Sequence, residues 1–360
     1  DDKIIKASKK SGVSIHELTN KFHKIYNEDM FSLNVEPPNI QPKATEYIDE
    51  MIKMIKKLIK NKCAYISNDH VIFNVDSYKY YGKLSRRSVD EQIAGARVEV
   101  ADFKKNSRDF ILWKPSINDE PGWDSPWGRG RPGWHIECSA MSHKCLNTPF
   151  DIHCGGVDLT FPHHENEIAQ SCSALKINSK PENFCRYWFH NGFVTANGDK
   201  MSKSLGNIKL VNEILKKYDG RTIRLGLISA HYRQPLNWTD EILEQSKVTI
   251  SRIDKNLEKI KDINSKTFDL NDNEYFLEFQ NCLFDDLNTP KALGVLKKLF
   301  SLVKKLPDSQ KSKIFQAISE GLNLLGLSKK LNQEKKIGDD FIINLIKQRD
   351  HARKIKDFTK

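Results

Sequence analysis

Three residues in the middle of the chain have side chains that suit a metal ion, namely Cys138, His163 and Glu167. His163 and Glu167 lie four residues apart at the start of an expected helix, so both project from one helix face. Cys138 follows residues 133–137, an aromatic and apolar run that predicts a strand and a turn. A thiolate, an imidazole and a carboxylate form a zinc set with an open fourth position. Taken alone, such residues are more often a surface pair and a packed cysteine. His164 has no carboxylate four residues on, which favours His163.

Two adjacent glycines, Gly155 and Gly156, follow a short apolar run and precede an expected helix. Glycines there allow a close approach of the backbone to a ligand, and Asp158 could accept a hydrogen bond from a ribose hydroxyl. A tight turn capped by Asp158 explains the same residues, and on the residues alone we favour the turn.

A third pattern of polar residues is KMSKSLGN at residues 200–207. Lys200 and Lys203, with hydroxyls between them, could fold around a triphosphate and neutralise charge that develops in a transition state. Most such runs are simply exposed polar loops.

The elements that must position these residues follow from periodicity. At 360 residues the chain is too long for one ordinary domain. The patterns predict loose helices at 1–36, a helix at 45–61, strands at 64–67 and 71–75, irregular structure at 115–134, α/β alternation at 134–190 and helices from 240 onward.

Composition narrows the class of protein. A hydrophobic fraction of 38% excludes wholesale disorder, and no apolar run is long enough to span a membrane. The net charge of +11 fits a polyanionic partner such as nucleic acid, but also an ordinary lysine-rich protein. Seven cysteines, an odd number, favour a reducing cytosol, so we expect a cytoplasmic location.

Taken together, KMSKS at 200–204, GWHIECSAM at 133–141 and FPHHENE at 161–167 closely resemble the signatures of the cysteinyl-tRNA synthetases, a class I aminoacyl-tRNA synthetase family. The resemblance runs from residue 1 to residue 360. It implies that Cys138, His163 and Glu167 are three of the four zinc ligands of the family.

The same resemblance assigns the remaining candidate residues. It implies that Trp134 and His153 line the cysteine pocket. It places Gly155, Gly156 and Asp158 in the adenosine-binding region, Lys203 on the ATP-contacting lysine of a mobile loop, and Lys200 beside it as a second catalytic lysine. Residues 288–290 and 348–353 resemble parts of the helical tRNA-binding bundle.

The implied fold class is α/β: a class I synthetase Rossmann-like catalytic domain with a connective insertion, followed by an all-α helical bundle. We expect the end of the first Rossmann half at 1–36, the insertion at 37–130, the second Rossmann half with the zinc and cysteine site at 131–190, a KMSKS connector at 191–240 and the tRNA-binding bundle at 241–360.

Three family features lie outside the resemblance. The HIGH signature and the fourth zinc ligand, a cysteine, belong upstream of the position equivalent to Asp1, and a small anticodon-recognition module belongs beyond Lys360. We therefore expect an internal fragment, incomplete at its N-terminus and C-terminal end, which by itself would be inactive or poorly stable.

The implied function is that of a cysteine–tRNA ligase, which activates cysteine with ATP to cysteinyl-adenylate and transfers it to tRNA(Cys). The implied cofactors are a single Zn²⁺ per chain, which selects the substrate thiolate, and Mg²⁺ with ATP. The implied partners are tRNA(Cys), ATP and L-cysteine, with no membrane, and we expect a monomer. The alternatives are a mycothiol-pathway cysteine ligase and a non-catalytic tRNA-binding paralogue.

Overall fold

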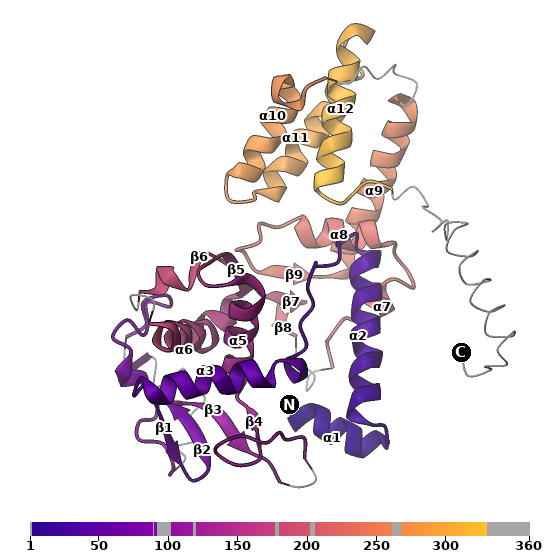
Figure 1. The fold of residues 1–360 in the computed structure, drawn as a ribbon. Helices are drawn as coiled ribbons and strands as arrows, with labels where there is room; N and C mark the ends of the chain where they lie inside the picture. Colours follow the sequence, from indigo (N-terminus) through magenta and orange to yellow (C-terminus); the bar gives the residue numbers. More distant parts are fainter. Residues whose placement is uncertain are drawn as a thin grey trace, which may run out of the picture.

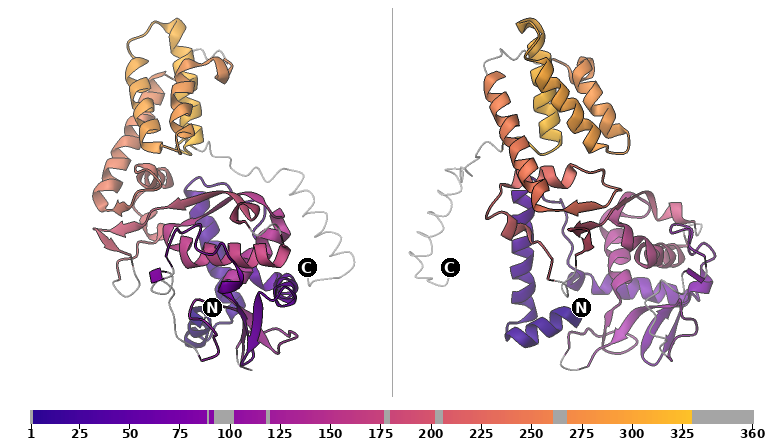
Figure 2. Two further views of the ribbon diagram at one scale, coloured as in Figure 1. Left: turned by 90° about the vertical axis from the view of Figure 1, so that its left-hand side faces the viewer. Right: turned by 180° about the vertical axis from the view of Figure 1, so that it is seen from behind.

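The computed structural model describes residues 2–88, 90–91, 102–117, 120–176, 180–201, 206–260 and 268–329. Their helices and strands form an α/β part and a smaller helical part that extends from one end of it (Figure 1 and Figure 2). The predicted order, an α/β unit followed by helices, is confirmed.

Two helices open the chain, as predicted: α1 (Asp2–Ser11) and α2 (Ile15–Ser32). Ser14 begins α2 with a capping box, in which its hydroxyl accepts from Glu17 N and the Glu17 carboxylate accepts from Ser14 N. No described side chain within α2 is buried. The C-terminal end of the helix is anchored by the partly buried Met30 and by the buried Leu33 just beyond it, which pack in one small core.

A helix packs on an antiparallel sheet of four short strands. The bounds are α3 (Ile48–Lys60), β1 (Ala64–Ser67), β2 (His70–Phe73), β3 (Phe110–Pro115) and β4 (Gly130–Pro132). The strands pair in the order β1-β2-β3-β4. Apolar residues recur every three or four positions in α3, which places Met51, Ile55 and Leu58 on one fully buried face.

The segment at 115–134, predicted to be irregular, contains β4. This strand reaches β3 because Gly130 has no side chain: a Cβ there would lie 2.4 Å from the indole nitrogen of Trp113. The prediction missed a strand that depends on a contact distant in sequence.

The prediction of a strand and a turn at residues 133–137 is wrong. Gly133 is extended and precedes the helix α5 (Trp134–Leu146), which carries Cys138 in its second turn. Ile136 and Ala140, four residues apart, are buried on one side of this helix. The aromatic and β-branched residues at its start favour strands locally and hide that period.

A β-α-β unit follows α5, as the α/β alternation predicts. Its elements are β5 (Phe150–Gly156), α6 (Glu165–Leu175) and β6 (Cys185–Asn191). The two strands are parallel, with His153 opposite Trp188 and Gly155 opposite His190. Because side chains alternate along a strand, these residues can face the same side of the pair.

One hydrophobic core joins these elements. It contains Met51 of α3, Phe73 of β2, Trp113 of β3, Ile136 of α5 and Ile168 of α6. The core therefore crosses the predicted boundary between residues 37–130 and 131–190. The division into an insertion and a second Rossmann half stays a prediction.

A three-stranded sheet connects the α/β part to the helices. Its strands are β7 (Val194–Ala196), β8 (Asp199–Lys200) and β9 (Leu236–Trp238), in the order β8-β7-β9. Two helices, α7 (Val211–Ile214) and α8 (Gly220–Ile228), lie between β8 and β9 in the sequence. Leu33, Ile223, Trp238 and Leu243 form a small core here, which ties the end of α2 to α8 and to the first turn of α9.

The helical part consists of α9 (Asp240–Ile260), α10 (Glu274–Phe284), α11 (Thr289–Leu302) and α12 (Asp308–Leu324). Its core includes Phe279, Leu296, Leu299 and Ile318. The predicted helices from residue 240 are confirmed as far as the description extends, and the predicted tail segments beyond residue 329 lie outside it. Among the described helices, none has the length and apolarity needed to cross a bilayer.

Gly220 at the start of α8 allows a close backbone contact. A Cβ there would lie 1.7 Å from the carbonyl oxygen of Ser32. We expect Gly220→Ala to lower the free energy of unfolding by about 2–4 kcal/mol, because backbone must move. The control is Gly294→Ala in α11, where a Cβ meets nothing within 4 Å. This variant should raise the free energy of unfolding by about 0.5–1 kcal/mol. Urea unfolding followed by circular dichroism measures both, and equal stability of the two variants would contradict the packing argument.

Candidate active site

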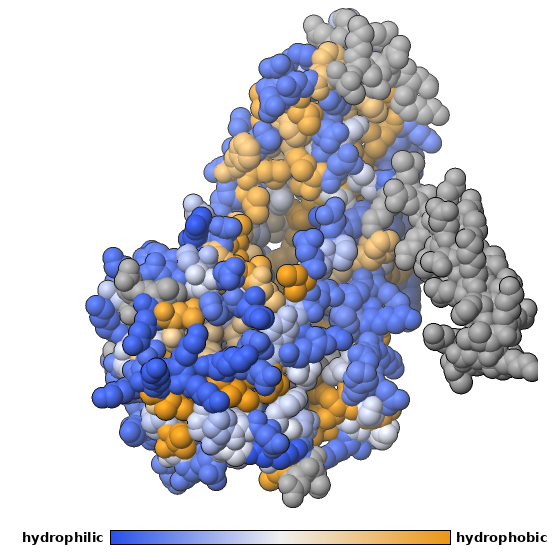
Figure 3. All heavy atoms as spheres, viewed as in Figure 1, coloured by the Kyte–Doolittle hydropathy of each residue, from blue (hydrophilic) through white to orange (hydrophobic). Residues whose placement is uncertain are grey.

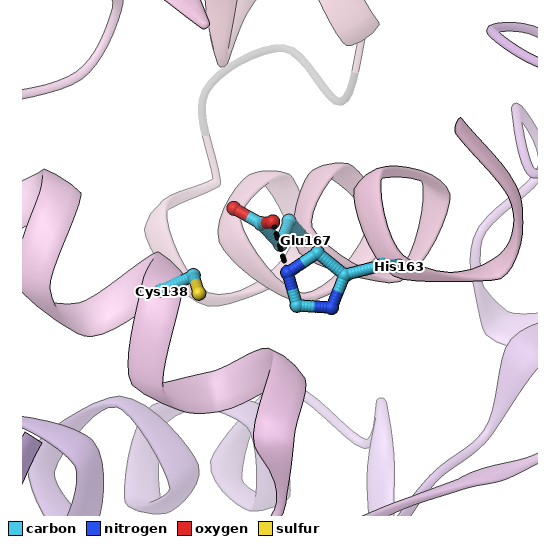
Figure 4. Close-up of side chains that lie close together, drawn as sticks. All are labelled: Cys138, His163 and Glu167. Atoms are coloured by element: carbon cyan, nitrogen blue, oxygen red, sulfur yellow. Dashed lines mark ion pairs between the residues drawn. The ribbon is translucent and has the colours of Figure 1, made fainter. Parts of the chain in front are cut away.

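Side chains from α5, from the turn before α6 and from α6 itself meet at one point (Figure 4). The ligand atoms of Cys138, His163 and Glu167 all lie within 4.8 Å of one another. His163 is held by the turn at Thr160–His164, in which Phe161 is extended. The structure thus brings together three residues that the sequence singled out, and their role as metal ligands stays a prediction.

The Glu167 carboxylate is fully buried, yet neither oxygen receives an aligned hydrogen bond from the described residues. Its Oε1 lies 2.9 Å from His163 Nε2 (Figure 4), and its Oε2 lies 3.4 Å from His153 Nε2. Burial raises the pKa of this carboxyl, but the two imidazoles outweigh burial and lower the pKa to about 2. An ionised, buried carboxylate without aligned donors has lone pairs available for a cation.

The imidazole of His163 is oriented by a second histidine. His163 Nδ1 and His135 Nδ1 lie 2.8 Å apart, at hydrogen-bond distance. Burial first, and then the proximity of His163, lowers the pKa of His135 to about 3, so this ring is neutral. A metal bound at Nε2 would replace the proton that faces Glu167, and His163 would then donate its Nδ1 proton to His135, an arrangement common around metal-binding histidines.

The thiol of Cys138 completes the donor set. Burial and the nearby Glu167 carboxylate raise its pKa to about 12, so the thiol stays protonated unless a cation offsets these effects. A thiolate, a neutral imidazole and a carboxylate are ligands that zinc accepts together. The orphaned carboxylate and the oriented imidazole therefore fit a zinc ion.

Glu167 also faces a second pair of histidines, His153 and His164, of which only His153 was expected in the site. Ligand atoms of His153, His164 and Glu167 also lie within 4.8 Å of one another. His164 Nδ1 is 2.8 Å from His190 Nε2, and burial lowers the pKa of His164 to about 3. The absence of a carboxylate four residues after His164 was thus no reason to set it aside, since Glu167 lies beside both adjacent histidines.

The residues that sequence reasoning missed are His135, His164, Trp188 and His190. Trp188 and His190 alternate along β6 opposite His153 and Gly155 of β5. Alternation along two paired strands could have indicated them, but only once the pairing of those strands was known.

Aromatic rings lie beside Cys138, His163 and Glu167, the candidate metal ligands. The Trp134 ring centroid lies 4.3 Å from that of His163, and the Trp134 side chain is 59% exposed. The His153 ring lies 4.9 Å from the Trp188 ring. Trp134 and His153, both expected in the cysteine pocket, therefore flank the same group of side chains, and their contact with cysteine stays a prediction.

The two glycines expected near adenosine have structural reasons of their own. A Cβ on Gly155 would lie 2.7 Å from Cε1 of His164, and one on Gly156 would lie 2.5 Å from Oδ1 of Asp158. Asp158 is exposed in the short helix Val157–Leu159. The contact with the His164 ring accounts for Gly155 without a ligand, whereas the exposed Asp158 side chain near Gly156 can move. Binding of adenosine by these residues stays a prediction.

The lysine motif is only partly described. Lys200 ends the strand β8, opposite Thr195 of β7. Lys203 lies within residues 202–205, outside the described residues, so the structure does not place it.

Comparison with known families accounts for most of the chain. Residues 1–248 match the family described as class I (C) tRNA synthetase catalytic domains, and residues 278–328 match the DALR domains. The second match begins within α10 and covers α11 and α12.

Whole-chain relatives agree with these matches. A cysteine–tRNA ligase from Parvibaculum lavamentivorans is 48% identical over 367 residues, which cover 99% of this chain and 77% of that protein. One from Pelagibacter ubique is 46% identical over 366 residues, with coverage of 99% and 77%. A solved Mycobacterium tuberculosis methionyl-tRNA synthetase in complex with methionyl-adenylate has a TM-score of 0.60 at 14% identity, over 90% of this chain and 79% of that chain, a likeness of fold alone.

The relatives' shared name does not favour the two alternatives considered from the sequence, the mycothiol-pathway cysteine ligase and the non-catalytic tRNA-binding paralogue. By family match and by identity over nearly its whole length, the chain belongs to the cysteine–tRNA ligases, class I enzymes that form an aminoacyl-tRNA.

Proposed function

We propose that this chain selects cysteine through a zinc ion and joins it to tRNA(Cys) at the site around Glu167. The observation that carries the proposal is the buried carboxylate of Glu167, which stays ionised with no aligned donor and lies within reach of Cys138 and His163. When bound, zinc supplies a Lewis acid that prefers the thiolate of cysteine to the hydroxyl of serine.

Each residue near the metal has a distinct task in this proposal. Cys138, His163 and Glu167 would hold the ion, and His135 would keep the imidazole of His163 in the binding tautomer. Trp134 and His153 would line the pocket for the rest of the amino acid. Discrimination through sulfur is strong enough that no editing site is needed, whereas an apolar pocket alone separates cysteine from serine poorly.

The reaction then proceeds in two steps. The cysteine carboxylate attacks the α-phosphorus of ATP, and pyrophosphate leaves. The terminal ribose hydroxyl of tRNA(Cys) attacks the carbonyl carbon of cysteinyl-adenylate, and AMP leaves. A carboxylate is already a nucleophile, so the first step needs positioning and charge stabilisation. Lys200 and Lys203 with Mg²⁺ would supply these, while Gly155, Gly156 and Asp158 would bind adenosine.

The helical part is the proposed tRNA-binding bundle. Its match to DALR domains and the net charge of +11 support a polyanionic partner. We propose that one chain, acting as a monomer in the cytoplasm, binds one tRNA.

Removal of the thiol tests the metal site. We expect Cys138→Ser to lose bound zinc, because a hydroxyl is a poor ligand, and to lose most cysteine-dependent ATP–pyrophosphate exchange. The control is Cys145→Ser on the same helix, which should keep both. Zinc is measured by plasma mass spectrometry after dialysis. Zinc retained in Cys138→Ser would exclude this residue as a ligand.

The contact between His135 and His163 gives a second test. His135→Ala should weaken zinc binding by about 10–100-fold, because the His163 tautomer is no longer held. His135→Asn places an amide near the same position and should restore part of the affinity. Competition with a coloured chelator measures the affinities, and an unchanged affinity in His135→Ala would contradict the orienting role.

The lysine loop has its own test. We expect Lys203→Ala to slow cysteinyl-adenylate formation by about 10²–10³-fold, since one stabilising charge is removed from the transition state, while cysteine affinity stays within about twofold. The control is Lys209→Ala, at an exposed position nearby. Rapid-quench kinetics and cysteine titration measure the two quantities. Lost cysteine binding with intact activation would reverse the assigned roles.

A further inference from the structure

A single arginine bonds both to the α/β part and to the bundle. Arg224 of α8 is half-buried. Its Nε donates to the carbonyl oxygen of Leu325 at 2.6 Å, just past α12. Its Nη1 donates to the carbonyl oxygens of Leu33 at 2.9 Å and Asn34 at 3.2 Å, just past α2. One guanidinium on α8 therefore connects the ends of α2 and α12, three chain segments that are distant in sequence.

The segments around Arg224 also contact one another. The Asn34 side-chain amide donates to the carbonyl oxygen of Gly326 at 2.9 Å. Gly326 has a φ of +66°, and a Cβ there would lie 2.4 Å from Arg224 Nε. Glycine is thus needed both for the backbone angle and for the space that the guanidinium fills. Among the described residues, these hydrogen bonds of Arg224 go to carbonyl oxygens.

Two further contacts hold the bundle. Beside Arg224, Arg221 donates to the carbonyl oxygen of Leu327 at 2.8 Å and to Asp254 of α9 at 2.7 Å. Before α11, Asp286 accepts from Arg233 and from Tyr232, each at 2.6 Å. Between the bundle and the α/β part the surface is hollowed (Figure 3), and at this junction these side chains act together with the unbroken helix α9 and with Leu225 of α8, which belongs to the bundle core.

We propose that Arg224 is a positioning residue for the transfer step: it sets the orientation of the bundle so that tRNA held there presents its end to the active site. This inference rests on the proposed tRNA-binding role of the bundle. Arginine suits the task because its planar, multi-donor group can bond carbonyls on two sides, whereas a lysine ammonium is a single point donor. Burial lowers the pKa of Arg224, a cost consistent with a specific structural role.

The test separates activation from transfer in the full-length protein. Arg224→Ala should leave cysteine-dependent ATP–pyrophosphate exchange within about twofold, and lower the single-turnover transfer rate to tRNA by about tenfold or more, since charge-assisted bonds across the joint are lost. The transfer rate of Arg224→Lys should lie between those of Arg224→Ala and the unsubstituted protein. The control is Arg252→Ala, which removes an exposed guanidinium from α9. Small-angle X-ray scattering should show a broader distance distribution for Arg224→Ala alone.

A milder variant protects the test against misfolding. Asn34→Gly keeps a residue that tolerates the φ of +56° but removes the hydrogen bond to Gly326. It should also slow the transfer step, by a smaller factor than Arg224→Ala does. Unchanged transfer in Arg224→Ala, or equal losses in activation and transfer in both variants, would overturn the proposal. Unsubstituted protein that forms adenylate but charges no tRNA would refute the proposed function itself.

Discussion

The charge on the Glu167 carboxylate is the interaction on which the active site depends. Buried carboxylates ordinarily take up a proton, but imidazoles on both sides keep this one ionised. Its two oxygens face different histidines, His163 and His153, so one side chain lies between the proposed metal ligands and the proposed cysteine pocket. His163 in turn is oriented by His135, and His164, which also lies beside Glu167, by His190. The donors are thus arranged before any ligand binds, which lowers the cost of binding.

Local patterns were sufficient to predict much of the fold. The stripe through Met51, Ile55 and Leu58 predicts α3, because a helix buries one face at a fixed period. Spacing by four placed His163 and Glu167 together, because the turn before α6 continues into the helix. Both predictions concern residues whose relation is set within a few positions of the chain.

The predictions that were wrong or missing concern residues whose structure depends on contacts distant in sequence. Residues 133–137 look like a strand because their local preference is real, and only burial of Ile136 and Ala140 against the core makes α5 a helix. Strand β4 depends on Trp113 lying over Gly130. His135 and His190 were missed because each acts through a partner more than 25 positions away. Tertiary contacts override local propensity at each of these places.

Gly155 links two parts of the molecule that would otherwise be independent. The ring of His164 fills the space where a side chain would stand on β5, so the strand that leads toward the expected nucleotide region lies against a ring beside the proposed metal ligands. A larger residue at either position would push on the other. The sizes of residues 155 and 164 therefore constrain each other, and a change at one has to be matched at the other.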